Sequence, residues 1–464
     1  MAKKSVKSKT AVRFRLVSSE GGHGKGTMKL TVDTPAVRNL LFEGSFGLEK
    51  ESLRVMKDTG LFAKTPHPFS NPLIVQDFAE NQTEINTKVC SSWKEARKAC
   101  EEMTIAMLQK LDLQNEVLWP FSNPAPIRNE ADIPMLESGS NEAIAYRRYL
   151  NRRYGKYKMV YSGIHYNFAF SDAMLAEQYR LDQPGISFQA FKDAFYLDLC
   201  QKILRYGWII DVLLNASPIY DGSLFAEEDL GKTGFSGMSS MRNSALGYWN
   251  FFTPYLDYSS IEAYTGSIET YVDSGLLKAP RELYYPVRIK PAGAYSLEAL
   301  VRDGISHIEL RMVDLNPYEL SGISEADAAF CHLFLIYLAA HDFEPLSWKD
   351  QIYAAQNFKN ASFYSIEQAR ILQAGKPALS VLEASEQLLQ AMQDFFAPID
   401  EQAAALIRKQ QAMLNHPQIL RKCEQVRRDF ADFGRQGLEQ AIWLQRKALA
   451  NCSDLLILEE KGSI

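Results

Sequence analysis

Short segments in which apolar and polar residues alternate are the clearest pattern between about residues 40 and 320. Three such segments are FEGSFGLEKESLRV, YSGIHYNFAF and SHIELRMVDL. Alternate residues of a strand point to the same side, so these segments predict strands with one apolar face. Helical stretches and Pro, Gly and Asn turns separate them at long, irregular intervals, without a GxGxxG turn. This texture predicts an α+β fold and argues against a doubly wound nucleotide-binding sheet.

The pattern changes to helical periodicity after about residue 321. Apolar residues then recur at helical intervals, as in Val381, Leu388, Met392 and Phe395, and again in Val426, Phe430, Phe433 and Leu444. We therefore expect an α+β region at 31–320 and a helical region at 321–464 that packs on it. Residues 1–30 are basic and rich in small residues, which predicts a flexible leader. The GGHGKGT segment fails the spacing of a phosphate-binding loop, because Gly26 follows Lys25.

Polar residues at spacing two inside the predicted strands are the candidates for chemistry. The pairs are Glu49 with Glu51, His165 with Asn167, Glu309 with Arg311, and Glu84 with Asn86. The wet face of an antiparallel sheet explains any one pair. Several pairs weaken that explanation, because the set holds carboxylates, one imidazole, amides and one guanidinium instead of mixed Lys, Thr and Ser. Such oxygen ligands suit Mg²⁺ or Mn²⁺, and an adjacent arginine suits a phosphoryl group, so metal-bridged ATP chemistry is the hypothesis.

A second acidic cluster lies in DFAENQTEINT, which supplies Asp77, Glu80 and Glu84. A continuous strand would point Asp77 and Glu84 in opposite directions and hold them far apart. We therefore predict that this segment turns and brings the two carboxylates together, with Glu80 outside the cluster.

Composition limits the partners. The 464 residues include 51 basic and 56 acidic ones, for a formal charge of −5, which argues against a nucleic-acid-binding surface and favours small-molecule substrates. The six cysteines show no CxxC pair, so neither a zinc site nor a disulfide framework is indicated. Neither a membrane span nor a signal peptide is evident, so we expect a cytoplasmic protein. The sequence leaves open whether it is a monomer or a dimer.

Seven motifs over some 270 residues carry a family resemblance. They are GLEKESLRV, DFAENQTE, WPFSNP, SGIHYNF, MRNSALGY, RELYYPVR and IELRMVDLNP. In order and approximate spacing the chain resembles bacterial glutamate–cysteine ligase, either the monofunctional enzyme or the ligase half of the bifunctional glutathione synthase. The sequence ends at Ile464 without room for the second, ATP-grasp half, so we expect no glutathione synthesis itself.

The resemblance implies a glutamine-synthetase-like fold, in which a curved, mostly antiparallel sheet forms a funnel surrounded by helices. It implies that ATP phosphorylates the γ-carboxylate of L-glutamate and that the amine of L-cysteine attacks the γ-glutamyl phosphate. The products are γ-glutamylcysteine, ADP and phosphate, in the first step of glutathione biosynthesis.

The resemblance also assigns residues. It implies three magnesium ions held by Glu49, Glu51, Asp77, Glu84, His165 and Glu309. Arg311 binds the transferred phosphoryl group of ATP and is catalytic together with Glu309. The substrate-binding positions are Tyr146, Asn167, Arg242, Tyr248 and Tyr284, with Phe78, Leu150 and Met159 in the acceptor pocket.

Met159 departs from the family, which usually carries a glutamine there. A thioether in place of an amide makes the acceptor pocket softer and more apolar, so an amino acid or amine other than cysteine is an alternative acceptor. Two further alternatives are a metal-dependent hydrolase that activates water with the same carboxylates, and a non-catalytic binding protein that recruits partners through its helical third.

Overall fold

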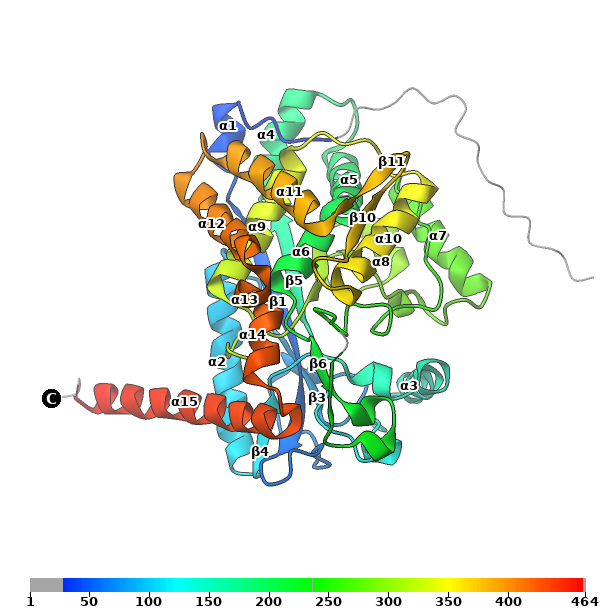
Figure 1. Ribbon diagram of the computed structural model, residues 1–464. Coiled ribbons are helices and arrows are strands. Elements are labelled where there is room, and N and C mark those ends of the chain that lie inside the picture. The colour runs from blue at the N-terminus through cyan, green and yellow to red at the C-terminus, as the bar shows by residue number, and fades with distance from the viewer. Residues whose placement is uncertain (1–27, 236, 462–464) are drawn as a thin grey trace, which may run out of the picture.

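The computed structural model describes residues 28–235 and 237–461, with side chains up to residue 450. Residues 1–27 of the predicted leader, including the GGHGKGT segment, lie outside the described residues. In the described part of the chain, helices surround a central antiparallel sheet (Figure 1). The prediction of an α+β fold in place of a doubly wound sheet is confirmed.

The central sheet has seven strands and every pairing in it is antiparallel. Its order is β2 (Ile74–Gln76), β3 (Gln82–Asn86), β1 (Gly44–Met56), β5 (Ile164–Phe170), β9 (His307–Val313) and β8 (Val287–Lys290), and β4 (Glu116–Trp119) also pairs with β1. Strand β1 is the longest and lies in the middle. The three segments with the clearest alternation therefore become the adjacent strands β1, β5 and β9.

One face of β1 packs on helix α2 (Trp93–Asp112). Phe46 and Leu48 are buried on this strand, and so is Lys50 between the two acidic residues. The Nζ atom of Lys50 donates to the carbonyl oxygen of Leu320 at 2.6 Å and to Thr104 Oγ1 at 3.2 Å, which satisfies most of its donors. Glu49 and Glu51 point to the opposite face.

Helices surround the sheet (Figure 1). Before the last third they are α1 (Pro35–Arg38), α2, α3 (Asn141–Tyr154), α4 (Asp172–Asp182), α5 (Phe188–Tyr206), α6 (Trp208–Leu214), α7 (Ile261–Asp273) and α8 (Leu297–Asp303). A second small sheet pairs β6 (Ile219–Asp221) with β7 (Thr233–Phe235). Serine side chains accept a hydrogen bond from the first turn of most of the longer helices, which fixes where these begin.

The last third contains α9 (Glu325–Ala340), α10 (Trp348–Phe363), α11 (Val381–Phe396), α12 (Glu401–Ala412), α13 (Pro417–Leu420), α14 (Lys422–Asp429) and α15 (Phe433–Lys461). Val381, Leu388 and Met392 are buried on α11, as their spacing predicts. The periodicity did not predict the hairpin of β10 (Arg370–Gln373) and β11 (Lys376–Ser380), which Gly375 helps to close with a φ of +68°. No helix in the described ranges is long and apolar enough to cross a bilayer.

Candidate active site

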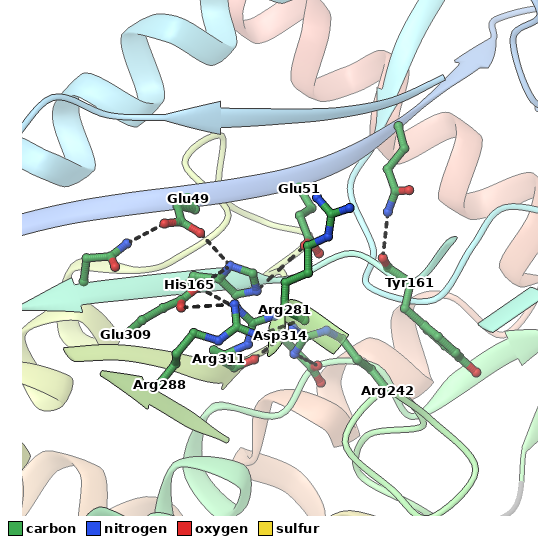
Figure 2. Close-up of polar contacts among 12 residues, drawn as sticks. Glu49, Glu51, Tyr161, His165, Arg242, Arg281, Arg288, Glu309, Arg311 and Asp314 are labelled. Atoms are coloured by element: carbon green, nitrogen blue, oxygen red, sulfur yellow. Dashed lines mark hydrogen bonds and ion pairs between the residues drawn. The ribbon is translucent and has the colours of Figure 1, made fainter. Parts of the chain in front are cut away.

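The register of β1, β5 and β9 brings the predicted polar pairs together. Glu49 lies opposite His165, and Asn167 lies opposite Glu309. All of these side chains lie on the face of the sheet away from α2, where Figure 2 shows Glu49 and Glu51 directed at His165. His165 is 5% exposed and Glu309 is 0% exposed, while Glu49, Glu51 and Asn167 are partly buried. The explanation by a fully solvated sheet face therefore does not apply to His165 and Glu309.

His165 is at the centre of the cluster. Its Nδ1 atom lies 2.8 Å from Glu49 Oε2 and 3.1 Å from Glu309 Oε1, and its Nε2 atom lies 3.8 Å from Glu51 Oε1. One ligand atom each from Glu49, His165 and Glu309 lies within 4.8 Å of the other two. Asn167 donates to Glu49 Oε1 at 3.1 Å and so orients that carboxylate.

Basic side chains line the other side of Glu309. Arg311 Nη1 donates to Glu309 Oε1 at 2.6 Å. Lys290 Nζ lies 3.3 Å from Glu49 Oε1 and 3.8 Å from Glu309 Oε2, and Arg288 Nη1 lies 3.9 Å from Glu309 Oε2. The sequence analysis missed Arg288 and Lys290, although they show the same signal. They are spaced by two on β8, with buried Val287 and Ile289 facing the core.

Asp77 and Glu84 lie on either side of a turn, as predicted. Strands β2 and β3 form a hairpin in which Val75 pairs with Glu84, and β3 places Glu84 opposite Glu51. Burial and the charge of Glu51 raise the pKa of Asp77 to about 6. Burial, followed by the charges of Glu49, Asp77 and Glu51, raises the pKa of Glu84 to about 8. The acids at this end of the cluster therefore repel one another.

Glu80 lies outside the acidic cluster, as predicted. It is partly exposed, and its Oε1 atom accepts a hydrogen bond from the backbone amide of His67 at 2.8 Å. That contact belongs to the loop before the hairpin and gives Glu80 a local structural role.

At the centre of the cluster, around His165, basic groups lie beside the carboxylates. Burial and Arg311 lower the pKa of His165, but hydrogen bonds to Glu309 and Glu49 outweigh them and raise it to about 9. Burial raises the pKa of Glu309, yet Arg311 and His165 hold it well below its usual range. Without a bound cation, His165 is thus an imidazolium between carboxylates at neutral pH.

The donor set fits a divalent cation. Glu309 Oε2 and Asn167 Oδ1 are buried and accept no hydrogen bond from any residue that the structure describes. Carboxylate oxygens with one imidazole nitrogen are ligands that Mg²⁺ and Mn²⁺ accept. A cation here would replace the proton on His165 and satisfy the lone pair of Glu309.

Two cavities meet the cluster from different sides. A cleft of about 900 Å³ runs along the ends of β1 and β5, and Glu49, Asn167 and Lys290 line its inner part. A small pocket of about 40 Å³ has Arg311 in its wall. Arg242, Tyr248 and Tyr284 also line this pocket, and the rings of the two tyrosines lie 4.2 Å apart.

Arg242 is fixed from several directions. Its Nη2 atom donates to the carbonyl oxygen of Arg311 at 2.9 Å, and its Nη1 atom donates to Asn243 Oδ1 at 3.1 Å. The buried carboxylate of Asp314 lies 3.9 Å from Nη1. The guanidinium lies so close to Gly163 that a Cβ there would come within 2.7 Å of Nε and closer still to Cζ and Nη2. Gly163, just before β5, thus leaves room for Arg242 beside the acidic cluster.

Four of the predicted substrate-binding residues do not line either cavity. Tyr146 on α3 stacks under the guanidinium of Arg281 at 3.9 Å. Phe78, Leu150 and Met159 are buried in the main apolar core. Their predicted part in an acceptor pocket stays a prediction.

The site combines carboxylates and an imidazole that suit a divalent cation with a guanidinium that suits a phosphate group. The model of the glutamate–cysteine ligase family matches residues 30–274 and 251–361, so the chain belongs to that family. The family resemblance of the seven motifs is thereby confirmed.

Relatives agree with this membership. The glutathione biosynthesis bifunctional protein GshAB of Listeria monocytogenes serotype 4b is 36% identical over 404 residues, which are 83% of this chain and 52% of that protein. The GshAB of Pasteurella multocida is 37% identical over 307 residues, or 64% of this chain and 40% of that protein. The chain thus spans about half the length of these relatives.

Solved structures share the fold. A bifunctional glutathione synthetase from Pasteurella multocida superposes with a TM-score of 0.79 at 28% identity, over 91% of this chain and 55% of that one. A glutamate–cysteine ligase from Francisella tularensis, solved in complex with AMP, superposes with a TM-score of 0.77 at 20% identity. That match covers 88% of this chain and 89% of the other, and it shows the fold alone.

Proposed function

We propose that this protein joins the γ-carboxylate of L-glutamate to the amine of L-cysteine at the expense of ATP. The reaction runs through γ-glutamyl phosphate and yields γ-glutamylcysteine, ADP and phosphate, the first step of glutathione biosynthesis. Membership of the glutamate–cysteine ligase family supports the reaction class. The observation that carries the proposal is the cluster of Glu49, His165, Glu309 and Arg311 between two cavities of different size.

The two cavities suit two kinds of substrate. The larger cleft has room for a nucleotide and presents Lys290 and Lys192 to its phosphates. The small pocket presents Arg242, whose planar fork binds a carboxylate through two parallel hydrogen bonds in a way that lysine cannot copy. We therefore place ATP in the cleft and an amino-acid substrate at Arg242. Asn167 and the tyrosines Tyr146, Tyr248 and Tyr284 complete the substrate contacts in this proposal.

The residues between the cleft and the small pocket act on the phosphoryl group. Arg311 lines the small pocket, and its guanidinium, which donates to Glu309 at 2.6 Å, would stabilise charge on the transferring group. Glu49, Glu51, Asp77, Glu84, His165 and Glu309 would hold Mg²⁺, with Mn²⁺ as an alternative. A metal held there would neutralise charge on the phosphates. Burial of the junction excludes water, which protects γ-glutamyl phosphate from hydrolysis.

Met159 favours a second candidate, a γ-glutamyl ligase with another amine acceptor. It is 3% exposed and packs in the apolar core beside the proposed acceptor side, where the family resemblance expects a polar amide. An acceptor pocket lined by Phe78, Leu150 and Met159 would favour apolar side chains over polar ones.

The family resemblance also supports proposals about the fold, the domain organisation and the location of the protein. The antiparallel sheet would be the curved funnel of the glutamine-synthetase-like fold, with residues 31–320 as the catalytic region and residues 321–464 as a helical region packed on it. Five cysteines in the described part of the chain are free thiols, which agrees with the reducing cytoplasm as its location. Its partners would be small molecules, without nucleic acid or membrane.

A coupled assay of ADP release tests the function. We expect release that requires glutamate, Mg²⁺ and an amine together, with cysteine giving the highest kcat/KM in a panel of amino acids and alkylamines. A higher kcat/KM for another amine would support the second candidate. Product formation without ATP would instead identify a metal-dependent hydrolase and contradict both.

A further inference from the structure

A separate cavity of about 370 Å³ lies among α5, α6, α9, α10, α11 and the β10–β11 hairpin. No residue that we assign to the active site lines it. Helices α6 and α10 stand between this cavity and the small pocket, because Trp208 and Asn357 face the cavity while Asp211 and Phe358 face the pocket. Its volume is in the range that small ligands occupy in proteins.

Aromatic rings form much of the cavity wall. Tyr206 and Trp208 come from the junction of α5 and α6, Tyr337 from α9 and Tyr353 from α10. Leucine side chains of α11 and the hairpin fill the gaps between them. Flat, polarisable walls of this kind favour a planar ligand, because a ring can stack on them with little loss of conformational freedom.

The polar groups in the wall are mostly unused donors. The hydroxyl groups of Tyr206, Tyr337 and Tyr353 make no hydrogen bond with any residue in the described ranges, and Lys376 makes no ion pair there. Asp350 is the one carboxylate in the wall. One of its oxygens already accepts hydrogen bonds from Ser347 at the start of α10.

Arg205 is the strongest of these donors. Its guanidinium stacks on Phe343 at 4.9 Å, and its Nη2 atom donates to the carbonyl oxygen of Glu344 at 3.2 Å. The nearest carboxylate oxygen, on Asp350, is 3.9 Å away. Its Nε atom is buried and has no acceptor among the described residues. A buried guanidinium N–H without a partner costs free energy, which an anionic ligand would recover.

We propose that this cavity is a binding site for a small planar carboxylate. The ring of the ligand lies between the tyrosines and Trp208, and its carboxylate accepts hydrogen bonds from Arg205 and from tyrosine hydroxyls. Two basic residues against one carboxylate in the wall favour an anion over a neutral or cationic ligand. The site requires no metal, and it is independent of the proposed ligase reaction.

Isothermal titration of the full chain with 2-naphthoate tests the site, with uncharged 2-naphthylmethanol as the matched probe. ATP and Mg²⁺ are kept saturating, and Arg242→Gln is measured in parallel to exclude binding at the active site. We expect 2-naphthoate to bind at least about tenfold more tightly than the alcohol, because hydrogen bonds to a charged group carry the difference. Arg205→Gln should remove that preference, and Arg242→Gln should keep it.

A second variant, Ala391→Phe, fills the cavity from α11 at a partly exposed position that lines it. It should abolish binding of both probes, with folding checked by circular dichroism and thermal melting. No binding at millimolar 2-naphthoate, equal binding of acid and alcohol, or loss of binding in Arg242→Gln would overturn the proposal. Should Ala391→Phe fail to fold, the comparison of Arg205→Gln with Arg242→Gln still decides.

Discussion

Two buried clusters of charged side chains include residues of β1, and they differ in how their charges are balanced. Near the end of β1, Arg54 and Glu116 are both fully buried, and Arg54 Nη1 donates to Glu116 Oε2 at 2.8 Å. The two Nη atoms of Arg54 also donate to Thr65 and to the carbonyl oxygen of Glu80. The charge of Arg54 is thus matched by Glu116, although its Nε atom has no acceptor among the described residues, and such a matched pair is typical of a structural role.

The group around Glu49 is not balanced in this way. Glu309 Oε2 is buried without a hydrogen-bond partner among the described residues, and burial together with the neighbouring acids raises the pKa of Glu84 to about 8. The difference teaches that burial of charge alone does not identify a site. Surplus acid together with unused acceptors points to one, because such groups cost folding free energy that a bound ligand can recover.

Glu309→Gln should have the largest effect. It removes the carboxylate that contacts both His165 and Arg311, so kcat should fall by about a thousandfold, as expected for loss of a preorganised charge at a phosphoryl-transfer site. Steady-state ADP release measures it. Glu80→Gln is the matched control outside the cluster and should stay within about twofold of the original chain. A similar loss in both variants would contradict the assignment.

Glu116→Gln should have the opposite signature. It leaves the Arg54 charge buried without its partner, so the free energy of unfolding should fall by about 3–5 kcal/mol. Urea denaturation measures that loss, and kcat per folded molecule should change little. The comparison fails if Glu116→Gln lowers kcat while leaving the urea midpoint unchanged.

Gly163→Ala tests the position of Arg242. The added methyl group displaces the guanidinium, which is the flexible end of its side chain, so the protein should fold while KM for the carboxylate substrate rises about tenfold or more. Gly266→Ala on α7 is the matched control, because a Cβ there meets no atom within 4 Å. It should leave KM unchanged and add up to about 1 kcal/mol of stability. An unchanged KM in Gly163→Ala would remove Arg242 from the substrate site.

The smallest effect is the pH dependence of magnesium binding. The pKa of Asp77 is raised to about 6 and that of Glu84 to about 8, so these carboxyls hold protons near neutral pH. Mg²⁺ must displace those protons in order to bind. The rise in melting temperature on adding Mg²⁺ should therefore be larger at pH 8 than at pH 6. Without Mg²⁺, the stability of the protein should change with pH in the opposite direction. The folded state holds these protons more tightly than the unfolded state, so stability should fall as pH rises through this range. A magnesium shift that shrinks between pH 6 and pH 8 would contradict the account.

The sequence was sufficient to predict the polar residues of the site but not their partners. Spacing by two identified Glu49, His165 and Glu309, because the period of a strand is local. The contact between Glu49 and His165 joins residues 116 positions apart, and only strand order and register determine it. Arg288 and Lys290 showed the same spacing, but they lie on a short strand after a turn-rich segment, where alternation over so few residues does not distinguish a strand from a loop.

Two features of the fold resisted prediction for different reasons. The alternation along β1 breaks after Glu51 because residues 52–55 are all buried, in the part of the strand that pairs with β4. Helix α2 also packs on β1. The β10–β11 hairpin has mostly exposed side chains on β11, so no apolar alternation marks it against the helical background. Tertiary packing determines both features.

The central claim is that the acidic cluster around Glu49 is completed by a bound metal ion. The most direct test is anomalous scattering from crystals of the protein grown with Mn²⁺ and a non-hydrolysable ATP analogue. The account predicts an anomalous peak coordinated by Glu49, His165 and Glu309, with analogue phosphates reaching it from the cleft that Lys290 lines. Manganese bound only at other residues, with His165 still hydrogen-bonded to Glu49 and Glu309, would contradict it.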